Sequence, residues 1–176
     1  MKKIYVKLSG QSIDNAIKYL EQYKRIMLHK IEDLLTELAN EGVSIASAKF
    51  ESALYAGDND VNVNFEQRGN NKIAIIATGN ATLFIEFGTG VKYPDSHPLA
   101  NENGMKHGTF GHKLGALPNG WRYKGNPGNM GELITQGKHK GEVKTYGNPA
   151  NESMYQTERE LEQKFTEIVK RVFNDG

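Results

Sequence analysis

The chain contains no cysteine and no long apolar run. Without cysteine, neither a disulfide framework nor a zinc site with thiolate ligands can form. No apolar run approaches the roughly 20 residues of a membrane helix. The basic first ten residues lack the apolar stretch of a signal peptide. We therefore expect a soluble protein that is made inside the cell and contacts no membrane.

Apolar content is also low, at 38% hydrophobic residues with a mean hydropathy of −0.60. The core must therefore come from a few well-patterned segments. A length of 176 residues fits one domain, so we expect residues 1–176 to form a single unit with one large excursion.

Charge is nearly balanced, with a net value of +1. Residues 91–147 hold 8 Lys and Arg against 4 Asp and Glu, and the rest of the chain holds 14 against 17. A dedicated nucleic-acid-binding protein usually carries a stronger basic patch. Contact with a polyanion that ignores its sequence remains open.

The first part of the chain predicts a short strand and then a long helix. Residues 3–9 alternate in the manner of a strand. Ser12 is placed to cap a helix over residues 12–40, about 40 Å long. Its apolar residues recur at steps of three and four: Ile13, Ile17, Leu20, Tyr23, Met27, Ile31, Leu34 and Leu38. Such a helix either packs partly on another chain or lies wholly on its own domain.

The middle of the chain predicts an antiparallel meander. Residues 43–55 fit a second, short helix only loosely. Residues 61–65 and 72–78 read as two strands joined by a hairpin turn, and residues 81–87 read as a third. On that third strand Phe84 and Glu86 would share one face, and Leu83, Ile85 and Phe87 would share the other.

A long excursion and a final helix complete the chain. Residues 91–147 show no periodicity and hold 11 of the 19 glycines and 4 of the 5 histidines. Loops of this length are commonly functional. Residues 151–173 carry a helical apolar pattern, with Pro149 ending any preceding strand and Asn151 placed to cap. The predicted fold is α+β: an antiparallel meander packed against a long N-terminal and a C-terminal helix, with a Gly-rich insertion.

Glu86 is the most conspicuous candidate for chemistry. Aromatic neighbours can raise the pKa of a carboxyl group and suit it to general acid catalysis. That role needs a second titratable group, and the sequence indicates none. A carboxylate satisfied by backbone amides, or by a basic group of another chain, is the favoured interpretation. Gly88, Thr89 and Gly90 are too short a run for a phosphate-binding loop and predict a sharp exit from the strand.

The remaining candidates favour binding over catalysis. His97, His107, His112 and His139 have spacings that match no compact metal motif, so solvated loop histidines are expected. Trp121, Arg122 and Tyr123 form an aromatic and basic cluster. It suits stacking on nucleic acid bases or anchoring on a protein partner, and the near-neutral charge favours the protein.

Taken together, these stretches resemble one family. "FIEFGTG" (84–90), "HGTFGHKLG" (107–115), "GWRY" (120–123) and "YGNPANESMYQTERELEQ" (146–163) are similar, in this order, to the small tail components of tailed bacteriophages and prophages first seen in Hong Kong 97-type phages. "IEFGTG" is the most specific element. The "GNPA" run with Pro149, followed by Met154 and Tyr155, is the second. Unlike the common small members, this chain has the long segment 91–147.

The resemblance implies a structural role without catalysis or cofactor. Members are minor tail, tail-completion, neck or head–tail joining proteins, made in the bacterial cytoplasm and built into the virion. The implied assembly is a homo-oligomeric ring around the DNA channel. Its implied partners are the connector or stopper and the tail-tube or tail-terminator proteins, with only non-specific contact to DNA.

Glu86 would then face a basic group such as Lys92, Lys113 or Arg122, of the excursion or of the next protomer. On that hypothesis, Glu86→Gln weakens assembly and leaves the isolated fold intact. Two other classes stay open: a nucleic-acid-contacting module with steep salt dependence, and a hydrolase with a pocket where a second acid or a histidine converges on Glu86.

Overall fold

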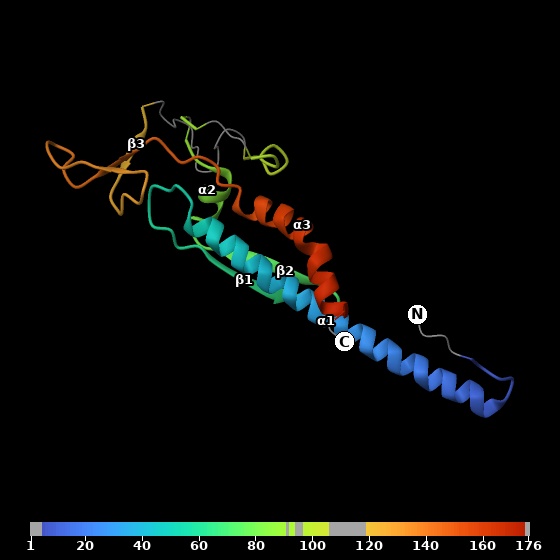
Figure 1. Cartoon of the computed structure of the whole chain (residues 1–176). Coiled ribbons are helices and arrows are strands. Elements are labelled where there is room, and N and C mark those ends of the chain that lie inside the picture. The colour runs from blue at the N-terminus through green and yellow to red at the C-terminus, as the bar shows by residue number, and fades with distance from the viewer. Residues whose placement is uncertain (1–4, 91, 94–96, 106–118, 175–176) are drawn as a thin grey trace.

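The computed structural model describes residues 5–90, 92–93, 97–105 and 119–174, and Figure 1 shows their arrangement. Helix α1 packs along helix α3 and also against a two-stranded sheet, and a second, small sheet lies at the far end of an elongated molecule. The predicted α+β class is therefore confirmed. The elements are α1 (Gly10–Glu51), β1 (Asn62–Gln67), β2 (Ile73–Thr78), α2 (Thr82–Phe87), β3 (Trp121–Tyr123), β4 (Glu132–Leu133), β5 (Val143–Thr145) and α3 (Ser153–Asn174).

Helix α1 is longer than the sequence pattern predicted. It begins at Gly10, two residues before Ser12, and it continues without a break through the predicted second helix to Glu51. Gly42 does not end the helix. A Cβ at this position would meet the Ile75 and Leu161 side chains. The glycine instead allows close packing of the helix. Its buried residues, Ala39, Gly42, Ala46 and Phe50, all belong to its final third.

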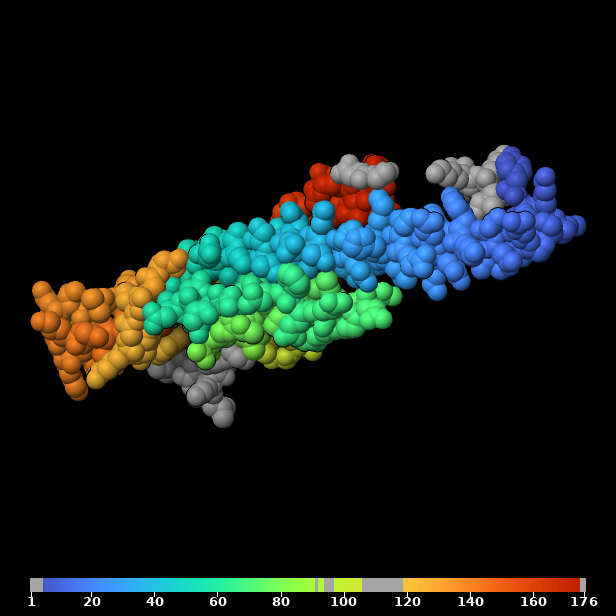
Figure 2. Space-filling model, turned by 90° about the horizontal axis from the view of Figure 1, so that it is seen from below, coloured from blue at the N-terminus to red at the C-terminus, as the bar shows by residue number. Residues whose placement is uncertain are grey.

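The first half of α1 stands clear of the rest of the protein (Figures 1 and 2). We call residues 10–29 the tip of α1. The first hydrogen bonds from α1 to another element come from Lys30, whose Nζ donates to the Val172 and Phe173 carbonyls of α3. The tip nevertheless carries large apolar side chains that are 40–55% exposed: Ile13, Ile17, Tyr19, Leu20, Tyr23, Ile26 and Leu28. The sequence left two alternatives for this helix: packing partly on another chain, or lying wholly on its own domain. The exposed tip shows that the second alternative is wrong.

The main core lies between the C-terminal part of α1 and the β1–β2 hairpin. The strands pair antiparallel with Asn62 opposite Thr78 and Gln67 opposite Ile73, as predicted. Phe50 and Ile85 are the largest side chains in this core, together with Ala46, Ala53, Val63 and Ala81. Burial of such side chains is the main term that stabilises the fold.

The predicted third strand is wrong, because residues 82–87 form helix α2. Ala81 and Ile85 are each 1% exposed, a spacing of four, and Glu86 and Phe87 are buried as well. A short run of mostly apolar residues occurs both in buried helices and in buried strands. The periodicity of so short a run cannot distinguish the two. The turn before α2 is fixed by Asp60, whose carboxylate accepts hydrogen bonds from the Asn80 and Ala81 amides at 2.9 Å.

Two further predictions need correction. Residues 5–9 form no strand, and residues 3–4 lie outside the described residues. The excursion 91–147 is not wholly irregular, since it contains an antiparallel three-stranded sheet in the order β3-β5-β4. Its strands have only two or three residues each, too few for an alternating pattern to be recognised.

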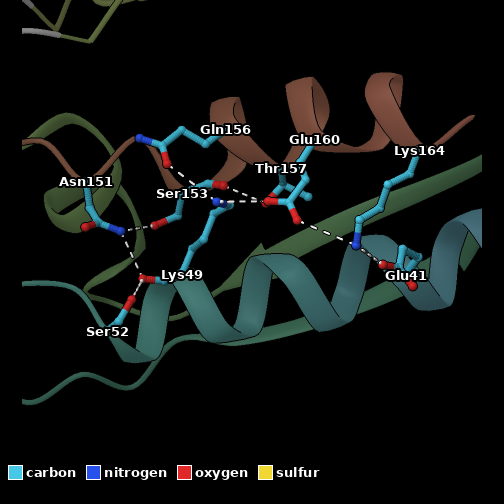
Figure 3. Close-up of polar contacts among 9 residues, drawn as sticks. All are labelled: Glu41, Lys49, Ser52, Asn151, Ser153, Gln156, Thr157, Glu160 and Lys164. Carbon is cyan, nitrogen blue, oxygen red and sulfur yellow. Dashed lines mark hydrogen bonds and ion pairs between the residues drawn. The ribbon is translucent and has the colours of Figure 1, made fainter.

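Helix α3 packs along α1 through a polar seam (Figure 3). Lys49 of α1 contacts Glu160 at 3.3 Å, and Lys164 of α3 contacts Glu41 at 2.6 Å. Contrary to the prediction from the sequence, Asn151 does not cap α3 with its side chain. Its amide donates to the Lys49 carbonyl at 2.9 Å and to Ser153 Oγ at 2.7 Å, and so ties the end of α1 to the start of α3.

Candidate functional site at the start of helix α3

Glu86 meets the first turn of α3 and caps it from a distant part of the sequence. Its Oε2 accepts the Met154 amide at 2.8 Å, and its Oε1 accepts the Tyr155 amide at 3.1 Å. These are amides that no carbonyl within the helix can satisfy. A carboxylate here is also favoured by the positive end of the helix dipole. Glu86 is only 5% exposed, so it is an internal structural contact.

His97 completes the surroundings of this carboxylate. Its Nε2 lies 2.9 Å from Glu86 Oε1, and its Nδ1 accepts the Leu99 amide at 3.1 Å. The proton must therefore be on Nε2, which donates to Glu86. The ring is 4.3 Å from that of Phe87 and 5.7 Å from that of Tyr155, centroid to centroid. His97 thereby fastens the start of the excursion to α2 and α3.

The two motifs that carried the family resemblance lie against each other. Thr89 and Asn148 exchange backbone hydrogen bonds at 2.9 and 3.2 Å. Thr89 Oγ1 also accepts the Asn148 side-chain amide at 3.1 Å, and Asn148 Oδ1 accepts the Ala56 amide at 2.7 Å. The residues after α2 are thus joined to the residues before α3 and to the end of α1.

Gly88 and Gly90 make this close approach possible. Their φ angles are +74° and +79°, in the region that favours glycine. A Cβ at Gly88 would meet the backbone of Asn148, Pro149 and Ala150 at 2.7–3.0 Å, and one at Gly90 would meet the Tyr146 carbonyl at 2.5 Å. The "GTG" run is therefore a site of backbone contact, in agreement with its predicted role as a sharp exit, although from a helix.

An apolar groove lies directly beside this junction. It has a volume of about 980 Å³ and is lined from α1, β2, α2, α3 and the start of the excursion. Leu38, Ile75, Leu83, Leu161 and Phe165 are among its apolar residues, and Glu158 and Glu162 are among its polar ones. Glu86, His97, Met154 and Tyr155 also line it. We call this hollow the groove; it is large enough for part of a helix or for an apolar ligand.

The aromatic and basic cluster lies elsewhere, on β3. Trp121 is 37% exposed and borders a separate hollow of about 340 Å³ that Phe84, Thr89 and Tyr123 also line. Arg122 Nε is 3.4 Å from Glu142 Oε2, and the Tyr123 hydroxyl donates to the Asn126 carbonyl at 2.7 Å. This aromatic and basic cluster therefore does not lie at Glu86. Trp121 and Tyr123 lie instead beside Phe84 and Thr89, on another surface.

Several residue-level predictions for the site are thereby corrected. Within the described residues, Glu86 contacts neither Lys92 nor Arg122, because Arg122 pairs with Glu142 and Lys92 lies over the Tyr93 and Tyr146 rings. Lys113 lies outside the described residues. Since Glu86 is buried at a helix end, neutralising it should affect the isolated fold as well as any assembly. The alternative of a carboxylate satisfied by backbone amides is confirmed.

The histidines also differ from expectation. His97 is buried and bonded, and not solvated. His139 contacts Glu142 at 3.1 Å, and His107 and His112 lie outside the described residues. No group of three His, Asp or Glu side chains in the described part of the chain could hold a metal ion.

The roles of His97 and Asn148 at this site were not predicted from the sequence. Asn148 belongs to the "GNPA" run and His97 is one of the histidines of the excursion, but each finds its partner through a contact with another segment of the chain. Among the described residues, no helix is long and apolar enough to cross a membrane. Comparison with protein-family models, with curated proteins and with solved structures found no match.

Proposed function

We propose that this chain is a structural virion protein of a tailed bacteriophage or prophage, which forms a ring at the neck or at the top of the tail. Its partners are copies of itself, the connector or stopper, and the tail-tube or terminator proteins, with non-specific contact to DNA in the channel. The sequence resemblance suggests this role. The observation that carries it is the tip of α1, an amphipathic helix that projects from the body and whose large apolar side chains no other element within the described residues covers.

A projecting apolar helix is costly for a protein that works alone. The exposed side chains of the tip, from Ile13 to Leu28, follow helical spacing over about 22 Å, so they form a continuous surface. Extended apolar surfaces of this kind mark contacts with other proteins. A subunit of a ring buries such a surface against its neighbours, and closed symmetry leaves none exposed.

A hydrolase is the second candidate, because His97 lies 2.9 Å from Glu86 beside a groove. That is the arrangement which the hydrolase hypothesis requires. The bonding disfavours it: both oxygens of Glu86 accept backbone amides, and both nitrogens of His97 are engaged. A general base must reach the proton that it abstracts, and here each atom already has a partner. Turnover of a substrate that disappears in Glu86→Gln but persists in a stability-matched variant would favour the hydrolase.

A nucleic-acid-binding module is less well supported by the described surface. Arg122 pairs with Glu142, and this reduces the positive charge available for phosphate. Tight DNA binding by the monomer, with a steep salt dependence, would nevertheless favour that class over ours.

Co-assembly tests the proposed function. The purified chain should bind the connector or tail proteins encoded with it and join them into a complex of defined stoichiometry. Size-exclusion chromatography with light scattering measures this directly. Failure to bind any head, connector or tail component would contradict the proposal.

A further inference from the structure

We infer that the tip of α1 from one copy docks in the groove of a second copy, so that the chain associates head to tail. This inference rests on the proposed ring-forming role and identifies the contact that builds the ring. It combines two features that no contact among the described residues of the protomer explains: a helix with an exposed apolar face, and a groove with an apolar lining.

The two surfaces cannot meet within one protomer. Leu35, Leu38 and Ala39 of α1 itself line the groove, and the tip belongs to the same continuous helix. The tip continues the axis of α1 beyond this lining, and it projects away from β2, α2 and α3, the other elements that line the groove (Figure 1). Only a second molecule can bring a tip to a groove.

The shapes and chemistry of the two surfaces match. The groove runs between α1 and α3 beside β2 and α2, a setting in which an amphipathic helix can insert its apolar face. The tip presents Leu20, Tyr23 and Ile17, each half exposed. In the groove, Leu83 and Phe165 are 40% and 48% exposed and would be covered by the docked helix.

The charges are also complementary. Among the described residues that line the groove there is no lysine or arginine, while Glu158 and Glu162 belong to it. Glu162 is 3.3 Å from Arg159, whereas Glu158 has no ion-pair partner in the part of the chain that the structure describes. On the tip, Lys24 lies between Leu20 and Leu28 at steps of four, so it is on the apolar face. Docking brings Lys24 to the acidic side of the groove.

A tip-to-groove contact is heterologous, because each copy offers one tip and one groove. Such contacts close into a ring when the rotation between neighbours allows it. This geometry needs no further interface to reach a closed oligomer. It also explains why a helix of 42 residues extends well beyond the part that its own core covers.

The test uses one variant on each surface and follows mass by analytical ultracentrifugation. Leu20→Asp alters the tip and Phe165→Asp alters the groove, and Gln22→Asp, on the polar side of the tip, is the matched control. Each of the first two should weaken self-association by about tenfold or more, since each removes a buried apolar contact. Gln22→Asp should associate like the wild type, and circular dichroism checks that all variants are folded.

Mixing the two defective variants gives the sharpest result. The Leu20→Asp chain keeps its groove and the Phe165→Asp chain keeps its tip, so together they should form a one-to-one dimer that cannot grow. Lys24→Glu and Glu158→Lys should each weaken association, and the two changes in one chain should restore it.

Any of the following results would overturn the inference: a wild-type chain that stays monomeric at its highest soluble concentration, an oligomer insensitive to both Asp variants, a mixture that forms no dimer, or charge reversal without recovery. A groove variant that loses only a connector protein would also overturn it, by assigning the groove to that partner. If assembly with virion proteins persists in all variants, the proposed function stands and this contact fails. If the contact behaves as inferred but no virion component binds, the proposed function fails instead.

Discussion

Glu86 shows how one side chain can connect three segments of the chain. Its carboxylate comes from α2 and accepts hydrogen bonds from two amides at the start of α3. It also accepts one from His97 Nε2 of the excursion. Hydrogen bonds to a charged, buried acceptor are worth more than those between neutral groups. The sequence made the residue conspicuous, with its aromatic neighbours and following glycines, but it could not name the partners, because they lie 11 to 69 positions away.

Glu86→Gln should lower the free energy of unfolding by about 2 kcal/mol. A glutamine amide offers one acceptor where the carboxylate offers two, and its NH₂ group would face donors. Urea unfolding of the monomer measures the effect, and Glu132→Gln, at an exposed position on β4, is the control. Equal stability of Glu86→Gln and the wild type would show that the carboxylate is not a structural cap.

Asp60 gives a prediction for pH. Hydrogen bonds from the Ala81 and Asn80 amides lower the pKa of this carboxyl group below its ordinary 3.8. A lowered pKa means that the stabilisation is complete above 3.8 and disappears as the pH falls through the lower folded value. Asp60→Asn should therefore melt at a lower temperature than the wild type at neutral pH, and the difference should shrink in strong acid.

Thermal melting followed by circular dichroism across this pH range checks the prediction for Asp60. Asp58→Asn, at an exposed neighbouring position, should show little difference from the wild type at any pH. A difference between Asp60→Asn and the wild type that persists unchanged in strong acid would contradict the role assigned to Asp60.

At the scale of elements, the sequence predicted best where a pattern is long. The sequence predicts the helical stripe of α1 and the β1–β2 hairpin correctly, whereas α2, with six residues, has the composition of a strand. The small sheet escaped notice because β4 has only two residues. Most of the candidate site was beyond prediction for a related reason: the approach of residues 88–90 to residues 147–150 depends on the whole fold, and no local pattern encodes it.

The junction between α2 and α3 can be tested through its glycines. Gly88 and Gly137 have similar φ angles of +74° and +80°, but only at Gly88 would a Cβ meet neighbouring backbone. Gly137→Ala should cost about 1 kcal/mol for the left-handed conformation alone. Gly88→Ala should cost clearly more, because the chain segments must separate. Chemical denaturation of both variants measures the difference, and equal losses would show that close approach at Gly88 is unimportant.

At the scale of the whole molecule, the asymmetry of the protein is its main functional clue. One end is a packed junction of helices, hairpin and excursion, and the other is the projecting tip of α1 (Figure 2), whose large apolar side chains are exposed. The sequence pattern predicted a helix about 40 Å long and left open whether its own domain covers all of it, and the structure shows which half is left uncovered. A protomer of this shape is understandable as one piece of a larger assembly.

The mass of the wild-type chain in solution, measured by light scattering over a range of concentrations, tests this account most directly. We predict a reversible rise from the monomer to one defined oligomer, and a further discrete complex when connector or tail proteins are added. A chain that remains a monomer at every concentration, alone and with those proteins, would contradict the account.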